Sequence, residues 1–171
     1  MNTYKYQMPA LTNSMEAISV KGIYNEEVYT IERFFQSKWQ SVLTGIMPGF
    51  VTNVRVYRNG EAVAETIDAV KMFGRPRWEV NNLISDANFI LQDKSMVKTH
   101  PRAIFYMDDT EYNIESDFGD KETRVYLEDE LVLTMSYNKS LPPREMTLEF
   151  LRPDLNEAVF ICLLHTYDIG F

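Results

Sequence analysis

Hydrophobic positions divide this chain into a long alternating part and a short end that is continuously apolar. Between Ala17 and Leu151, apolar and polar residues alternate in short runs, with turn-forming residues every 8–12 positions or so. Near the end of the chain, Ala158 to Leu164 form an unbroken apolar run. Period-two alternation is typical of half-buried β-strands, whereas a continuous apolar run indicates a segment that is buried on every side. The pattern therefore predicts many short strands followed by one helix.

The alternating part predicts eleven or twelve strand candidates. Asn59-Gly60 separates two of them and is a strong hairpin signal, because both residues tolerate positive φ. Pro76 interrupts another, which we therefore expect to be an edge or bent strand. The expected strands are residues 17–23, 28–34, 50–58, 61–70, 72–80, 89–92, 102–107, 112–116, 124–128, 131–137 and 146–151.

Three local expectations complete this outline. Residues 1–14 look like a loose or edge-lying lead-in. In the second strand, Tyr29, Ile31 and Arg33 should share one face, since side chains alternate across a strand. A short helix over residues 38–43 fits the irregular stretch that follows, and Gly45, Pro48 and Gly49 should end it.

The last stretch predicts a helix from Leu155 to Asp168. Asp154 and Glu157 resemble a capping box at its start, and Gly170 is a suitable stop. The apolar residues do not keep to one face, so the helix must be surrounded on every side. Burying five of its large apolar side chains, at roughly 1.5–3 kcal/mol each, contributes about 8–15 kcal/mol before entropic costs.

These two features together favour one architecture. Short antiparallel strands must close or stack to protect their edges. A β-sandwich has no need of a helix that is apolar all round, but a barrel of more than about eight strands has a lumen to fill. We therefore predict an all-β protein, a barrel of about twelve antiparallel strands that encloses one central hydrophobic C-terminal α-helix. The 171 residues are expected to form a single domain.

Composition narrows the function classes. The formal net charge is −8, and it is unevenly placed: residues 1–105 carry +2 and residues 106–171 carry −10. This balance disfavours nucleic-acid binding. The single cysteine, Cys162, excludes an intramolecular disulfide and a cysteine-rich zinc site. The polar N-terminus does not look like a signal peptide, and no apolar run reaches the roughly 20 residues of a transmembrane helix, so we expect a cytoplasmic protein.

Three features of the chain resemble the tubby C-terminal-like superfamily. They are the succession of short strands, the sequence Phe-Gly-Arg-Pro-Arg-Trp-Glu-Val at residues 73–80, and the closing helix at residues 157–168. This superfamily includes tubby domains, phospholipid scramblases and small LURP-one-related proteins. The resemblance covers nearly the whole chain and implies a twelve-stranded barrel around a hydrophobic helix. Tubby domains bind phosphoinositide head groups through surface basic residues, but the acidic balance here departs from that pattern. The calcium segment and the cysteine cluster of scramblases have no match.

The candidate ligand-binding site is a group of three cations and one aromatic residue: Lys71, Arg75, Arg77 and Trp78. Basic side chains can hold a phosphate head group while an aromatic ring sits at the membrane interface. Arg33 and Lys38 would add to this surface if their strands were neighbours. The alternative is a solvated strand whose cations pair with surface carboxylates. A second basic cluster, whose alternative is an ordinary charged loop, comprises Lys94, Lys98, His100 and Arg102.

Metal and enzyme signatures are weak. The acidic runs at residues 108–111 and 115–122 contain Gly119, but their spacing does not match a calcium loop. The nucleophile-elbow, phosphate-loop and dinucleotide motifs are absent from the sequence. His165 lies on the buried helix, where a neutral, hydrogen-bonded histidine is expected. Cys162, three residues away, should remain a thiol because burial disfavours the thiolate. We expect no metal site, no cofactor and no catalytic residue.

The sequence thus predicts a non-enzymatic binding module. One version binds anionic phospholipid head groups peripherally, through the basic cluster. The second docks a protein partner through the acidic half. A lipid- or ester-handling enzyme is the third alternative, and it would require a cleft that contains a titratable group with a shifted pKa.

Overall fold

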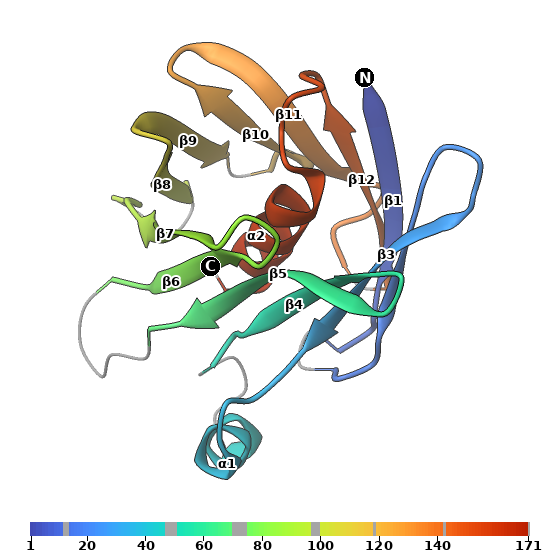
Figure 1. Ribbon diagram of the computed structural model, residues 1–171, viewed down its shortest axis with the longest axis vertical. Coiled ribbons are helices and arrows are strands. Elements are labelled where there is room, and N and C mark those ends of the chain that lie inside the picture. The colour runs from blue at the N-terminus through green and yellow to red at the C-terminus, as the bar shows by residue number, and fades with distance from the viewer. Residues whose placement is uncertain are drawn as a thin grey trace.

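The chain folds into a closed barrel of twelve antiparallel strands with one helix through its centre (Figure 1). The computed structural model describes residues 1–11, 14–46, 51–69, 75–96, 100–117, 119–141 and 143–170. Each strand pairs with its neighbours in sequence, and β1 pairs with β12 to close the ring. The predicted fold class is confirmed. The strands are β1 Asn2–Met8, β2 Ile18–Lys21, β3 Glu27–Arg33, β4 Val54–Arg58, β5 Glu61–Asp68, β6 Arg77–Asn82, β7 Ala87–Asp93, β8 Arg102–Met107, β9 Thr110–Ser116, β10 Glu122–Leu127, β11 Glu130–Tyr137 and β12 Arg144–Phe150.

Because side chains alternate along each strand, every second side chain faces the inside of the barrel. In β3 the residues predicted to share a face, Tyr29, Ile31 and Arg33, are all buried. The hairpin between β4 and β5 forms at Asn59-Gly60 as expected, with φ of 53° and 81°. Both positions lie in the left-handed region, which asparagine and glycine tolerate better than other residues.

The expectation for residues 1–14 was wrong. β1 is not a loose lead-in, because it pairs with β12 along its full seven residues, from Asn2↔Phe150 to Met8↔Arg144. Tyr4, Tyr6 and Met8 point into the core. On its other side β1 pairs with the short β2 at two positions only, Lys5↔Lys21 and Tyr6↔Val20. The barrel therefore closes through a long β1–β12 ladder and a short β1–β2 seam.

Pro76 also acts differently from the prediction. β6 begins at Arg77, directly after the proline, and then pairs with β5 on one side and β7 on the other. It is therefore not an edge strand. A proline just before the first residue of a strand removes no N–H from the ladder. The carbonyl of Pro76 still accepts a hydrogen bond from Asp93 N at 3.2 Å.

Helix α2, Glu157–Gly170, fills the barrel. Ten consecutive residues, Ala158 to Tyr167, are buried, which confirms a helix surrounded on all sides. Its start differs from the prediction. Asn156 is the N-cap, since its Oδ1 accepts from Val159 N at 3.3 Å, while Asp154 pairs with Arg152 outside the helix.

Glu157 closes the start of α2 against the barrel wall. Its carboxylate accepts hydrogen bonds from Tyr4 Oη at 2.5 Å, Tyr29 Oη at 3.2 Å and Asn2 Nδ2 at 2.6 Å. A carboxylate at a helix N-terminus also interacts favourably with the helix dipole. Three side chains from β1 and β3 thus fix the register of the helix against the strands.

The polar side chains of α2 have partners inside the lumen. Thr166 Oγ1 lies 2.5 Å from Thr66 Oγ1, and the Cys162 thiol donates to Val54 O at 3.5 Å. His165 Nδ1 lies 3.4 Å from Tyr6 Oη. Burial raises the pKa of Cys162 to about 12 and lowers the pKa of His165 to about 3. Cys162 is therefore a thiol and His165 a neutral imidazole at neutral pH, as the sequence predicted.

Removal of α2 should abolish the native barrel. Deleting residues 155–171 takes away the side chains that fill the lumen, a loss far larger than any single cavity that a core can tolerate. We expect an insoluble or molten product, detected by dye binding and by the loss of a cooperative thermal transition. A cooperative transition at the wild-type temperature would contradict this account of the core.

Acid should destabilise the fold through His165. Between the ordinary pKa of 6.5 and the folded value of about 3, the unfolded chain binds a proton that the folded chain does not. The free energy of unfolding should therefore fall as the pH drops through this window, by up to about 1.4 kcal/mol per pH unit from this group.

Denaturant titrations between neutral pH and about pH 5, just above the carboxylate range, measure this slope. We expect His165→Gln to flatten it, whatever its effect on absolute stability. His100→Gln, which replaces the other histidine of the chain, is the matched control for the loss of an imidazole. An unchanged slope in His165→Gln would refute the assignment.

Candidate functional site

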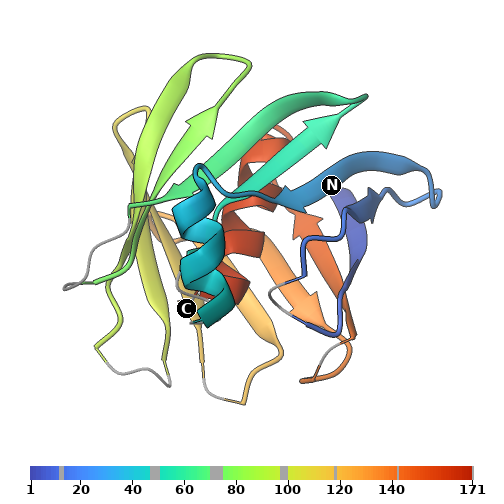
Figure 2. The same ribbon diagram turned by 90° about the horizontal axis from the view of Figure 1, so that it is seen from below.

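The connections between strands gather at two ends of the barrel. We call the end where α2 begins the proximal end, and the end where α2 stops the distal end (Figure 2). Asn2 meets Glu157 at the proximal end, and Arg144 meets Asp168 at the distal end. Because successive strands are antiparallel, the connections β3–β4, β5–β6 and β7–β8 all lie at the distal end. These three connections carry most of the basic residues singled out from the sequence.

The predicted site is only partly assembled. Arg75 and Arg77 are exposed at the distal end, at the start of β6. Trp78 is 2% exposed and faces the lumen, because adjacent residues of a strand point to opposite sides. It is therefore not available as a surface anchor. Lys71 lies outside the described residues.

The second basic cluster lies beside the first. Arg77 is opposite Gln92 in the β6–β7 ladder, and Lys94 N donates to Arg102 O at 2.8 Å. Lys94 is exposed on the connection next to Arg75 and Arg77. Arg102 differs, since its guanidinium pairs with Asp117 at 2.6 Å. Lys98 lies outside the described residues.

Two carboxylates at the distal ends of the neighbouring strands are engaged within the fold. Asp68 Oδ2 accepts from Thr52 N at 3.1 Å, and Asp93 Oδ1 accepts from Ser95 N at 2.7 Å. Both side chains are only partly exposed. The basic surface around Arg75, Arg77 and Lys94 can therefore present its positive charge to a ligand. We call these three residues the distal basic surface.

The proximal end is strongly acidic. Its turns expose many carboxylates, while Lys21, Arg58 and Arg152 supply positive charge there. The acidic residues of this end are Glu26, Glu27, Glu61, Asp86, Asp108, Asp109, Glu128, Asp129, Glu130 and Asp154. Carboxylates such as Glu16, Asp117 and Asp120 also lie on distal connections, but the excess of negative charge is greater at the proximal end, which gives the barrel a preferred orientation near a charged surface.

Trp78 closes the distal end of the lumen from inside. Gly170, the last residue of α2, lies so close to the indole that an added Cβ would stand 2.6 Å from Trp78 Cζ2. A glycine is needed here because the ring occupies the space of a side chain. The Trp78–Gly170 contact thus holds the end of α2 directly behind the strand that carries Arg77.

Helix α1, Lys38–Ile46, lies in the β3–β4 connection and projects from the side of the barrel (Figures 1 and 2). It is longer than predicted, because Gly45 lies within the helix instead of ending it. Lys38 is exposed at its first turn. Arg33 cannot join it, since its guanidinium is buried and Nη2 donates to Val51 O at 2.9 Å.

Sequence reasoning did not assign a function to α1. The signal was present, since Trp39, Val42, Leu43 and Ile46 follow the spacing of one helical face. All four side chains are exposed. The expectation that an apolar helical stripe faces the core hides such a feature until the structure is known.

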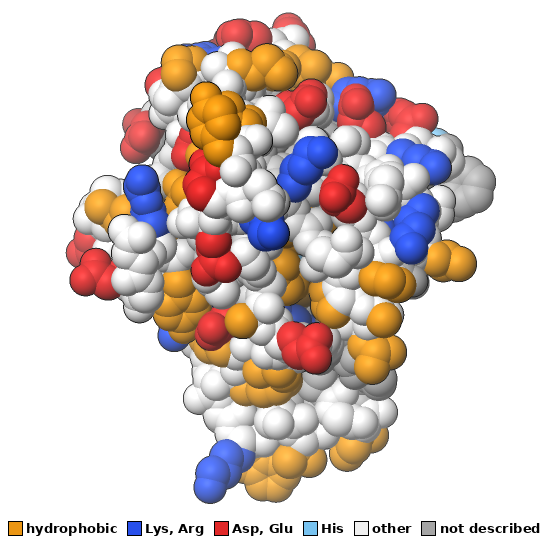
Figure 3. Space-filling model, turned by 90° about the vertical axis from the view of Figure 1, so that its right-hand side faces the viewer, with side chains coloured by type: hydrophobic (Ala, Val, Ile, Leu, Met, Phe, Trp, Pro, Cys, Tyr) orange, Lys and Arg blue, Asp and Glu red, His pale blue; other side chains and the backbone are white. Residues whose placement is uncertain are grey.

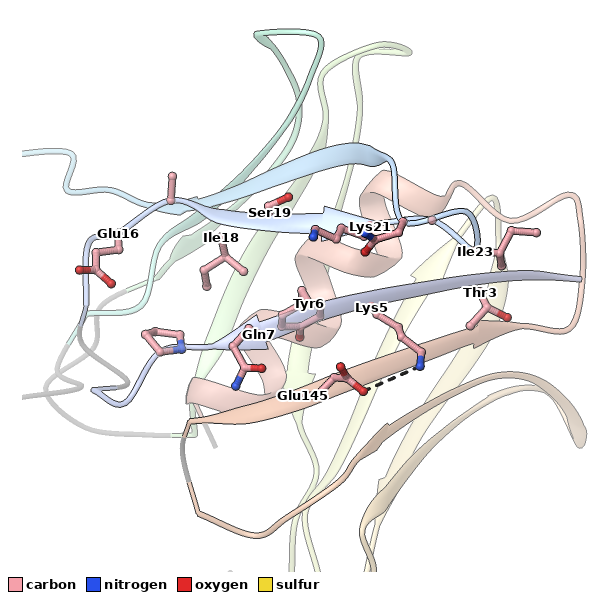
Figure 4. A pocket seen from close by; sticks show the side chains of 14 residues that line it. Thr3, Lys5, Tyr6, Gln7, Glu16, Ile18, Ser19, Lys21, Ile23 and Glu145 are labelled. Atoms are coloured by element: carbon pink, nitrogen blue, oxygen red, sulfur yellow. Dashed lines mark ion pairs between the residues drawn. The ribbon is translucent and has the colours of Figure 1, made fainter.

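A groove of about 840 Å³ follows the β1–β2 seam (Figure 4). Its walls carry charges of both signs, including Lys5, Lys21, Glu16 and Glu145, and Lys5 pairs with Glu145 at 3.8 Å. A mixed lining of this kind offers no net attraction to a phosphate. A second cavity, of about 350 Å³, lies at the proximal end beside Tyr29 and Glu157.

Perturbed groups at the proximal cavity have a structural explanation. Burial raises the pKa of Tyr29 to about 12 and raises that of Tyr4 further, and both hydroxyls are hydrogen-bonded to Glu157. They hold the start of α2 in place. Within the described ranges, no three or more His, Cys, Asp or Glu residues are grouped so that they could hold a metal ion.

Comparison with known families fits this architecture. The model of the Tubby C-terminal like domain matches residues 4–170, so the chain belongs to this family. Membership indicates a binding module. No curated protein and no solved structure matches the chain. In the part of the chain that the structure describes, neither helix has the length and hydrophobicity to cross a membrane.

The Trp78–Gly170 contact should respond to a single methyl group. We expect Gly170→Ala to lower the free energy of unfolding by about 1–3 kcal/mol, because the buried indole must shift. Gly45→Ala is the matched control. Its Cβ meets nothing within 4 Å, and it should be neutral or stabilise the fold by up to about 1 kcal/mol. Equal effects at the two glycines, measured by denaturant titration, would argue against the contact.

Proposed function

We propose that residues 1–171 act as one non-enzymatic domain that binds anionic phospholipid head groups peripherally, at the cytoplasmic face of a membrane. The observation that carries the proposal is the distal basic surface, formed by Arg75 and Lys94 on neighbouring connections and by Arg77 at the start of β6. Guanidinium groups bind phosphate oxygens through paired N–H donors, and lysine adds a mobile point charge.

The charge distribution along the barrel axis supports an orientation in which the distal basic surface faces the membrane. An anionic surface attracts the distal basic surface and repels the acidic proximal end. The overall charge of −8 is compatible with this, since most of the exposed carboxylates in turns point away from the proposed contact. Trp78 has no part in head-group binding in this proposal.

Liposome co-sedimentation tests the proposal directly. Wild-type protein should bind phosphatidylserine-containing vesicles at low salt, bind less at moderate salt and ignore neutral phosphatidylcholine vesicles. Each basic residue near an anionic surface contributes about 1 kcal/mol. Arg75→Glu with Arg77→Glu should therefore weaken binding by about 30-fold or more.

A matched variant controls for total charge. Lys21→Glu with Arg58→Glu makes the same change in net charge at exposed cations of the proximal end. This variant should keep wild-type binding. Equal loss in both variants would show a general charge effect, and vesicle binding that ignores both variants would contradict the proposed site.

A protein partner is the second candidate, favoured by the exposed carboxylates of the proximal end. Such a partner would present a basic surface, and complementary charge would guide its approach. Binding would survive the Arg75/Arg77 reversal and fail after reversal of Asp108 and Asp109, which form an exposed turn between β8 and β9. If the protein were instead a lipid- or ester-handling enzyme, it would hydrolyse a chromogenic ester, and one point substitution would abolish this activity.

A further inference from the structure

Helix α1 packs with its polar side toward the barrel and its apolar side toward solvent. Thr44 is its one buried residue among those described. Gln40 Oε1 accepts hydrogen bonds from Asn53 Nδ2 at 3.1 Å and from Gln36 N at 2.7 Å. On the outer face, Trp39 is 76% exposed and Ile46 is 73% exposed. A surface helix of a globular protein normally has the reverse arrangement.

The apolar face is continuous. Trp39, Val42, Leu43 and Ile46 occupy positions i, i+3, i+4 and i+7, which line up along one side of a helix. Figure 3 shows hydrophobic side chains on the surface of the protrusion at the bottom of the view, which α1 forms. A contiguous apolar face of this kind normally marks a contact with a lipid surface or another molecule.

The barrel holds α1 in its helical form. Ser37 caps the helix, since its Oγ accepts from Gln40 N at 3.3 Å, and the Gln40–Asn53 contact ties it to the start of β4. A nine-residue helix would be marginal on its own in water. Its apolar face is therefore ordered before any ligand arrives, which reduces the entropic cost of binding.

From these observations, and resting on the proposed function, we infer that α1 inserts its Trp39–Ile46 face into the interfacial layer of an anionic bilayer while the distal basic surface contacts the head groups. Charge selects this occupant, because the exposed cations Lys38, Arg75, Arg77 and Lys94 all lie on or beside connections that join the distal ends of the strands. Tryptophan prefers the membrane interface, and amphipathic helices bind there through apolar area together with basic charge.

The two tryptophans provide a direct probe. Trp39 is exposed and Trp78 is buried, so the emission of Trp39 reports on the environment of α1. Vesicles of phosphatidylcholine and phosphatidylserine in equal parts should shift the wild-type emission to the blue and protect it from iodide quenching. Trp39→Phe leaves only Trp78, and its emission should not change when vesicles are added.

Apolar substitutions test whether the face contributes binding energy. Val42→Ser with Ile46→Ser should weaken binding to these vesicles by about tenfold or more, because apolar area is withheld from the bilayer. The matched control is Ile23→Ser with Ile84→Ser, which removes two similarly exposed side chains at the proximal end. This control should bind as tightly as wild type. Circular dichroism confirms that both variants are folded.

The outcomes separate this inference from the proposed function. One outcome would overturn insertion but support head-group binding. In it, binding depends on salt and on Arg75 and Arg77, while vesicles leave the Trp39 emission unchanged and the Val42/Ile46 variant binds as tightly as wild type. Absence of vesicle binding would overturn both. A wild-type dimer in sedimentation velocity that the Val42/Ile46 variant converts to monomers would assign the face to a second copy of the chain and overturn insertion.

Discussion

The whole fold depends on the burial of α2. A helix that is apolar on all sides is insoluble alone, and a barrel of twelve strands has a lumen that its own side chains do not fill. Each therefore provides what the other lacks. The contacts at the two ends set the position of the helix: Glu157 receives the hydroxyls of Tyr4 and Tyr29 at one end, and Gly170 lies against Trp78 at the other. Within these limits, polar groups such as Thr166 find partners on the wall.

The same constraint explains what the sequence could reveal. Alternation and an all-round apolar helix leave few architectures, so the barrel, the Asn59-Gly60 hairpin and the neutral His165 follow from local rules. The role of β1 was less visible, because Tyr4, Tyr6 and Met8 alternate within a polar segment and their partners lie on β12. Long-range pairing of this kind leaves little local trace. The cap at Asn156 was missed because Asp154 offered an equally good pattern.

The candidate site was harder to foresee for a geometric reason. Sequence proximity grouped Arg77 with Trp78, yet the pleat sends neighbouring side chains to opposite faces. Conversely, Arg77 and Lys94 are 17 positions apart and come together only through the β6–β7 ladder. The apolar stripe of α1 was readable, but its direction was not. Whether such a stripe faces the core or the solvent depends on tertiary contacts, here those of Gln40 and Thr44.

The place of α2 in the chain has a consequence for biosynthesis. The helix that fills the lumen follows all twelve strands, and the closing ladder joins Asn2 to Phe150. During translation the strands emerge before the element that they must enclose, and the first strand waits for the last. Contacts this distant in sequence form slowly and leave strand edges exposed in the meantime. Folding can therefore be completed only after α2 has emerged from the ribosome. Until then, the nascent sheet needs protection from aggregation.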